Sequence, residues 1–259
     1  MAYKQLKLWF DGNLALMLSE KIKTHYPSLL SHGFVEQVQL QVPQLELKAR
    51  VECIADALSE HMTVAYRTDI NIFSKILGPE NKEETGMFTE YYWLMPIAKY
   101  VEKYGLDYFA LSMSMIEEIT KRNAGEYAIR PFLRKYPKKT MEQMKTWSMS
   151  NHKHVRRLAT EGIRPRLPWA PKLQSYINNP QPLIPILEQL KNDSSNYVQK
   201  SVANFINDIL KDNAGVATAL IENWASDIRP ACKWIIRHAL RNLRKANDPW
   251  AASIMTSIS

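Results

Sequence analysis

The sequence has little cysteine and little glycine, with 2 cysteines and 8 glycines in 259 residues. Cys53 and Cys232 lie far apart and form no Cys-x-x-Cys pair. This pattern favours two free thiols in a reducing cytoplasm over a disulfide scaffold. Because glycine is scarce and no alternating stretches are joined by Asn-Gly or Asp-Gly turns, the sequence argues against a hairpin-rich β fold.

Long apolar runs and clusters of metal ligands are missing as well. No stretch approaches the roughly 20 apolar residues of a membrane span, and the N-terminus lacks the apolar core and cleavage site of a secretion signal. His152 and His154 are two residues apart, which predicts that they face different sides of a helix, and no Cys/His cluster supplies ligands. We therefore expect a soluble, cytoplasmic, monomeric protein without a metal or cofactor.

Charge is distributed unevenly along the chain. Residues 1–120 have a net charge of −5, whereas residues 121–245 have a net charge of +14. A strongly basic half is typical of a protein that binds a polyanion, and nucleic acid is the leading candidate. An anionic membrane surface is the weaker alternative, because no basic amphipathic helix stands apart from the rest of the chain.

Hydrophobic residues, 46% of the chain, recur mostly with helical periodicity. Three segments of the second half open a predicted helix in a similar way, at offsets of 43 and 37 residues: His154–Arg157, Tyr197–Lys200 and Trp234–Arg237. These offsets match two-helix HEAT-like repeats. The sequence thus predicts an all-α fold, a single α-solenoid domain over residues 1–259, made of antiparallel helix pairs with a concave basic surface. Residues 1–120 would be mostly scaffold, and residues 121–245 would hold the basic, functional repeats.

The most informative stretch runs from residue 147 to residue 169. Its apolar spacing predicts a helix that is capped by Ser150 or Asn151 and reaches to residue 161. Gly162 follows where a left-handed stop is expected, and the prolines at 165 and 168 prevent the helix from resuming.

Glu161 then occupies the last helical turn, where the helix dipole disfavours an anion. Four arginines surround it in the sequence: Arg156, Arg157, Arg164 and Arg166. A carboxylate in this position, among guanidinium groups and close to Trp169, indicates a site. The alternative is an ordinary surface pair between Arg157 and Glu161, which are spaced i,i+4.

Two further helices carry charged residues of interest. From Lys233, steps of four residues reach Arg237, Arg241 and Lys245 on one predicted helical stripe, which suits a phosphate backbone. A merely solvated face normally mixes charges of both signs, and this stripe has no acid. On the helix predicted for 196–211, Asp208 is an acid on an otherwise neutral or basic side; a salt bridge to Lys211 is the alternative explanation.

Four segments together resemble the AlkC branch of the HEAT-like-repeat alkylpurine DNA glycosylases, the superfamily that also includes AlkD. The segments are Glu126–Phe132, His154–Trp169, Ser201–Asp208 and Trp234–Arg241. The resemblance spans nearly the whole chain. It implies excision of bases with small alkyl groups, chiefly 3-methyladenine, with 3-methylcytosine and 1-methyladenine also attributed to this branch.

The resemblance also implies roles for individual residues. Glu126, Glu161 and Asp208 match the active-site carboxylates of the branch, and Arg164 and Trp169 match residues that line the lesion pocket. Because the pattern differs from the AlkD branch, the catalytic aspartate of that branch is not carried over. Some AlkC proteins have an added β-sandwich domain after the repeats, and none is expected in a sequence that stops at residue 259.

The chemistry of the residues agrees with this resemblance. A base alkylated on a ring nitrogen is cationic and leaves readily, so the enzyme has to stabilise an oxocarbenium-like state and place water. Carboxylates do both in their ionised form, a tryptophan face suits a cationic base, and arginines hold phosphates. No lysine is singled out as a nucleophile, so a lyase step is not expected.

The expected partner is double-stranded DNA that contains alkylated bases. The residues expected to contact DNA are Arg156, Arg157, Arg166, Lys200, Lys233, Arg237, His238, Arg241 and Lys245. A non-catalytic scaffold that binds damaged or branched DNA is the alternative, because fold alone does not confer catalysis. The three carboxylates favour the enzyme, since acids on a phosphate-binding surface weaken binding.

Overall fold

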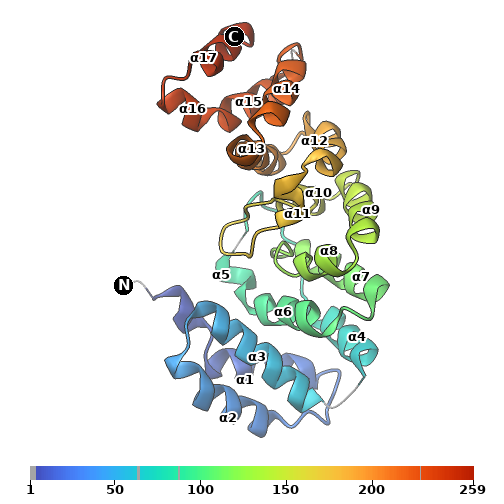
Figure 1. The fold of residues 1–259 in the computed structure, drawn as a ribbon. Helices are drawn as coiled ribbons and strands as arrows, with labels where there is room; N and C mark the ends of the chain where they lie inside the picture. The colour runs from blue at the N-terminus through green and yellow to red at the C-terminus, as the bar shows by residue number, and fades with distance from the viewer. Residues whose placement is uncertain (1–3, 63–64, 87, 228) are drawn as a thin grey trace. The chain divides into compact units, whose positions relative to one another are not determined.

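The computed structural model describes residues 4–62, 65–86, 88–227 and 229–259. Within these ranges every regular element is an α-helix or a short 3-10 helix, which confirms the all-α prediction (Figure 1). None of the described helices is both long enough and apolar enough to cross a bilayer. The chain divides into two compact units, Met1–Lys135 and Tyr136–Ser259. The predicted single domain and its concave basic surface stay predictions.

The N-terminal unit is built from helices that bury their apolar faces against one another. Its α-helices are α1 (Gly12–Lys23), α2 (Ser31–Gln41), α3 (Leu47–Met62), α4 (Tyr66–Ile76), α5 (Phe88–Tyr91), α6 (Met95–Tyr104), α7 (Phe109–Thr120) and α8 (Arg130–Lys135). Helix α2 packs against α1 and α3, α3 against α6, and α7 against α4 and α6. Short 3-10 helices cover Leu6–Trp9, Val42–Gln44 and Tyr92–Leu94.

Local sequence signals set several boundaries in this unit. The Asp11 carboxylate accepts the backbone N–H groups of Asn13 and Leu14 at 3.0 and 3.1 Å and so begins α1. The 3-10 helix at Leu6–Trp9 and α1 are therefore separate elements. Pro96 lies in the first turn of α6, where its missing N–H costs nothing, and Gly78 follows α4 with a φ of 75°.

Asp69 makes the stability of the N-terminal unit depend on pH. Its carboxylate is buried in α4, accepts the Tyr100 hydroxyl at 2.5 Å, and has its pKa raised to about 6 by burial. The pKa in the unfolded chain is about 3.9, so the folded state holds the proton more strongly. Stability is therefore expected to fall as the pH rises from about 4 through about 6.

The variant Asp69→Asn removes this titration. The unfolding free energy of the variant minus that of the native chain should be larger at about pH 7.5 than at about pH 4.5, by on the order of 1–2 kcal/mol. This value is already reduced for solvent screening. Urea unfolding at the two pH values measures the difference. Equal differences at both would show that Asp69 does not control the pH dependence.

The C-terminal unit consists of successive helix pairs. Its helices are α9 (Pro137–Ser148), α10 (Lys153–Glu161), α11 (Gln174–Asn178), α12 (Ile184–Leu190), α13 (Asn196–Asp212), α14 (Ala214–Ala225), α15 (Pro230–Ala239), α16 (Arg241–Lys245) and α17 (Pro249–Ser257), with a 3-10 helix at Gln181–Leu183. The pairs are α9 with α10, α12 with α13, and α14 with α15. Their second members pack in the order α10, α13, α15, as Figure 1 shows, so α13 is the central helix. This is the paired arrangement that the repeat pattern predicted.

The predicted basic stripe is not carried by one helix. Helix α15 ends at Ala239, Leu240 has a ψ of 1°, and a separate helix α16 begins at Arg241. Arg241 donates from Nη1 to the carbonyl of His238 at 2.7 Å and from Nη2 to Oδ1 of Asn204 on α13 at 3.0 Å. The break therefore coincides with an arginine that is held against the central helix. The four-residue spacing assumed an unbroken helix and was wrong on this point.

Candidate active site

The helix that carries Glu161 starts and stops differently from the sequence prediction. Helix α10 begins at Lys153 with His152 as N-cap, and Ser150 contributes by accepting the N–H of His152 at 3.1 Å. Gly162 has a φ of −64° and is right-handed, so the predicted left-handed stop is wrong. The N–H of Gly162 still donates to the carbonyl of Leu158, as in a helix. The two prolines that follow are sufficient to end the helix, so no left-handed residue is needed.

The two histidines lie closer together than expected. His152 precedes the helix in extended backbone, so the rule that residues i and i+2 face apart does not apply to it. The rings of His152 and His154 lie 5.4 Å apart between centroids. In the described part of the chain, no group of three or more His, Cys, Asp or Glu side chains is arranged to hold a metal ion.

Glu161 and Asp208 meet on a single arginine. Arg164 donates from Nη1 to Oε1 of Glu161 at 2.7 Å and from Nε to Oδ2 of Asp208 at 2.8 Å. All three residues are buried, with exposed fractions of 6%, 2% and 7% for Glu161, Asp208 and Arg164. The last turn of α10, the segment after it and the central helix α13 thus form one ionic cluster, the Glu161–Arg164–Asp208 triad.

Two hydroxyl groups complete the surroundings of Glu161. Ser201 donates to Oε2 of Glu161 at 2.6 Å, and the hydroxyl of Thr160 lies 2.7 Å from that of Ser201. Neither residue was predicted to belong to the site. Ser201 could have been found, because it precedes Asp208 by seven residues and so shares its face of the helix.

The charge state of Glu161 follows from these neighbours. Burial by itself raises the pKa of this carboxyl group, but Arg157, Arg164 and the Ser201 hydroxyl together outweigh it and lower the pKa below its usual value. Arg157 contributes from Nη2 at 3.7 Å, while its guanidinium lies over the Tyr197 ring at 4.7 Å. The predicted i,i+4 pair therefore exists, but the closer partner of Glu161 is Arg164.

The two carboxylates differ in how fully their oxygens are engaged. Both oxygens of Glu161 accept a hydrogen bond. In Asp208, Oδ2 accepts from Arg164, whereas Oδ1 forms an ion pair with the Nζ of Lys211 at 3.6 Å, which is too long for a hydrogen bond. The salt bridge to Lys211 that was the alternative explanation for Asp208 therefore exists, beside the closer contact with Arg164. Asp208 is therefore the carboxylate with an oxygen available for a further donor such as water.

Trp169 stands at the third position of a tight turn. The N–H of Ala170 bonds to the carbonyl of Leu167 at 3.3 Å, Pro168 takes the second position, and Trp169 has a φ of 62°. This is the pattern of a type II turn, which favours glycine or asparagine at the third position. A left-handed residue with a Cβ costs about 1–2 kcal/mol. Trp169 is 69% exposed.

Several predicted DNA contacts are engaged within the protein. Arg156 binds Asp193 through two hydrogen bonds of 2.5 and 3.0 Å, and Arg166 binds Asp212 through two of 2.5 Å. Arg164, predicted to line the lesion pocket, is buried between the two carboxylates. These guanidinium groups form ion pairs with carboxylates of the protein, and these pairs were not predicted from the sequence.

The other predicted DNA contacts are closer to solvent. Lys200, Arg237 and Lys245 are exposed, and Lys233, His238 and Arg241 are half-buried. Lys233 and Arg237 donate to carbonyl oxygens of Ser259 and Ile258, each at 3.3 Å. Neither of these contacts is made with an Asp or Glu side chain.

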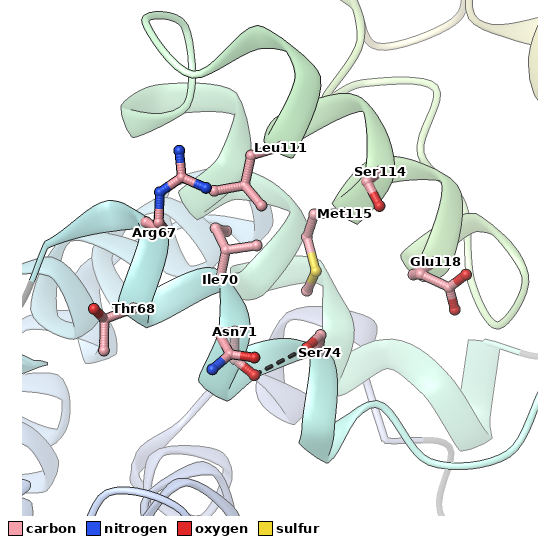
Figure 2. Close-up of a pocket in the computed structure, with 9 residues that line it drawn as sticks. All are labelled: Arg67, Thr68, Ile70, Asn71, Ser74, Leu111, Ser114, Met115 and Glu118. Carbon is pink, nitrogen blue, oxygen red and sulfur yellow. Dashed lines mark hydrogen bonds between the residues drawn. The ribbon is translucent and has the colours of Figure 1, made fainter.

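Glu126, the third predicted carboxylate, belongs to the N-terminal unit. It is buried in the turn before α8. The same unit contains a cavity of about 500 Å³ between α4 and α7, shown in Figure 2. Its walls include Arg67 and Glu118, and none of the predicted site residues lines it.

Comparison with known proteins gives three findings. A profile of the family described as DNA alkylation repair enzyme matches residues 98–243, a span that includes every predicted site residue except Lys245. An uncharacterised protein of Bacillus subtilis (strain 168), YhaZ, is 35% identical over 250 residues, covering 96% of this chain and 67% of its own length. The structure of Pseudomonas fluorescens alkylpurine DNA glycosylase AlkC, bound to DNA containing an abasic site analog, matches with a TM-score of 0.89 at 33% identity. That match covers 98% of this chain and 69% of AlkC.

Proposed function

Because the chain belongs to the family of DNA alkylation repair enzymes, we propose that it is a DNA glycosylase of base excision repair that acts on alkylated bases. The observation that carries the proposal is the Glu161–Arg164–Asp208 triad, which holds two carboxylates together by one arginine. The similarity to AlkC, solved with DNA that contains an abasic site analog, supports it. An abasic site is what remains when a base is excised.

The triad suits the hydrolysis of a cationic nucleotide. A base alkylated on a ring nitrogen leaves without a strong acid to protonate it, so the enzyme needs stable negative charge rather than a proton donor. The lowered pKa of Glu161 keeps its carboxylate ionised at neutral pH. An ionised carboxylate stabilises the oxocarbenium-like transition state electrostatically.

We assign different tasks to the two carboxylates of the triad. Glu161, whose oxygens are both bonded, supplies fixed negative charge. Asp208 accepts a proton from water through Oδ1, the oxygen that pairs with Lys211 only at 3.6 Å, and so acts as general base. Arg164 positions both carboxylates, which revises its predicted contact with the lesion. Glu126, which lies in the N-terminal unit, stays a proposed catalytic carboxylate.

The proposed substrates are 3-methyladenine, 3-methylcytosine and 1-methyladenine in double-stranded DNA. Hydrolysis by water leaves an abasic strand intact, so we propose a monofunctional enzyme without a lyase step, active as a monomer. Its action on DNA and its two free thiols, Cys53 and Cys232, agree with a cytoplasmic location.

Release of free bases tests the function directly. Duplex DNA treated with a methylating agent is incubated with the protein, and the released bases are identified by mass. We expect 3-methyladenine to be released, and the DNA strand to break only after alkaline treatment. If no alkylated base is released although the protein binds the DNA, the non-catalytic scaffold is the better description.

Trp169 is expected to contact the lesion rather than to stabilise the fold. Replacing it by glycine relieves the left-handed strain and removes an exposed ring, so the unfolding free energy should change by no more than about 1 kcal/mol. Excision should slow by about tenfold or more, because the ring offers its π-face to the cationic base. As a matched control, the buried Trp147→Ala should lose about 3–5 kcal/mol of stability. Unchanged excision by Trp169→Gly would remove this residue from the site.

The predicted basic residues divide into DNA contacts and structural ones. The double variant Arg237→Ala, Arg241→Ala should weaken binding equally on damaged and undamaged duplexes and reduce the salt slope by about two units. By contrast, Arg156→Ala should keep the salt slope and lose about 3 kcal/mol of stability, since Asp193 is left buried without its partner. Titrations at several salt concentrations and urea unfolding measure both. A reduced salt slope for Arg156→Ala would show that Arg156 contacts DNA after all.

A further inference from the structure

An exposed aromatic pair lies on α15. Trp234 and His238 are one helical turn apart, and their rings are stacked with centroids 4.9 Å apart and planes 8° from parallel. Trp234 is 38% exposed, in contrast to the buried Trp224 on the preceding helix. His238 covers one face of the indole. The stack therefore leaves part of an aromatic surface exposed to solvent.

Positive charges surround this aromatic stack. Burial is the main cause that lowers the pKa of His238, and the charges of Arg241 on α16 and Lys200 on α13 lower it further. A lowered pKa favours the uncharged form of the imidazole ring that stacks on Trp234. Lys233 precedes Trp234 and Arg237 follows it by three residues on the same helix, and both donate to main-chain oxygens near the end of α17. The surface has an aromatic centre and a cationic rim.

This combination fits a nucleotide whose base is unpaired. The rim binds phosphates, and the free face of an aromatic ring stacks on a base, which offers its own face only when it has left the duplex. We propose that Trp234 and His238 form a stacking platform for an unpaired base of a DNA strand, with Lys200 and Arg241 holding the neighbouring phosphates.

The platform adjoins the triad on the central helix. Lys200, Asn204 and Asp208 follow one another at steps of four residues on α13, so they share one face. Asn204 bonds to Arg241 beside the platform, and Asp208 bonds to Arg164 in the triad. At 1.5 Å per residue, Lys200 and Asp208 lie about 12 Å apart along the helix. One strand can therefore contact both places, and the platform deepens the proposed function by naming single-stranded DNA next to the lesion as a ligand.

Binding of a dye-labelled oligothymidylate to the full chain tests the platform. Trp234→Ala is expected to weaken binding of this single strand about tenfold, and Trp234→Phe to retain most of the affinity, because phenylalanine keeps a stacking face. Binding of a blunt duplex of equal length should change less than about twofold. Trp250→Phe serves as matched control, since this indole bonds to Glu222 on α14 and lies outside the platform. Thermal melting establishes that each variant is folded.

The possible outcomes are distinct. Equal weakening on single strand and duplex would reduce the surface to phosphate binding and overturn the platform, as would no weakening on either. The assay needs no excised base. If the protein released no alkylated base but Trp234→Ala still lost affinity for the single strand alone, the platform would stand and the glycosylase proposal would fail. Base release together with unchanged single-strand binding by Trp234→Ala would give the reverse result.

Discussion

Converting Glu161 to glutamine, or Asp208 to asparagine, should slow the excision of 3-methyladenine by about 10²–10³-fold. Each change keeps the size of the side chain and deletes its charge, and the loss of one preorganised electrostatic interaction typically has this effect on the rate. The effect should appear in the chemical step, because both carboxylates act on the oxocarbenium-like state and the attacking water. Single-turnover excision with excess enzyme measures that step.

Binding measured in parallel separates catalysis from affinity. DNA affinity of both variants should hold or rise, since an anion leaves a phosphate-binding region. Glu142→Gln is the matched control: it removes one charge from an exposed position on α9 and should keep the native excision rate. Native rates from both Glu161→Gln and Asp208→Asn would falsify the catalytic assignment and leave the scaffold explanation.

Loss of Arg164 should lower the stability of the fold strongly. Arg164→Met leaves Glu161 and Asp208 buried without the guanidinium that bonds both, and removing one partner of a buried ion pair costs about 3–5 kcal/mol. Urea unfolding at neutral pH measures the loss. Arg229→Met is the control. Arg229 is exposed, and the ion pair that an exposed arginine forms with Asp227 contributes little to stability.

The pH dependence of the stability of Arg164→Met is a second, independent test of the triad. In the native chain the pKa of Glu161 is lowered, so its contribution to stability is present above the unfolded pKa of about 4.3 and lost only in stronger acid. Removing Arg164 deletes two of the causes that lower the pKa of Glu161 while burial, Arg157 and the Ser201 hydroxyl remain, so we expect that pKa to rise in the variant. The variant should then be more stable at about pH 5.5 than at about pH 7.5, whereas Glu161 makes no such difference in the native chain. A stability that does not change over this range would contradict the triad as the source.

The helical elements and the acid–arginine cluster could be predicted because their signals are local. Apolar residues at helical spacing placed Glu161 in the last turn of α10 and Asp208 inside α13, as observed. The resemblance to AlkC added which carboxylates belong together. The match to AlkC at a TM-score of 0.89 confirms the fold class and the family from which the site was inferred.

The state of the arginines could not be predicted, because their partners are distant in the sequence. Asp193 lies 37 residues after Arg156, and Asp212 lies 46 residues after Arg166. Counted along the chain these arginines look like available cations, and only the packing of α10 against α13 pairs them. The break at Leu240 has a similar origin, since Arg241 is held by Asn204 of another helix. Local sequence carries no record of such contacts.

The left-handed backbone of Trp169 bears on how variants of this protein would respond to laboratory evolution. Selection for heat resistance alone rewards glycine or asparagine at the third position of a type II turn, so position 169 should be among the first to change. The resulting lineages would melt later and repair less. Selection under a methylating agent should retain tryptophan there, even in lineages that become more heat-resistant elsewhere.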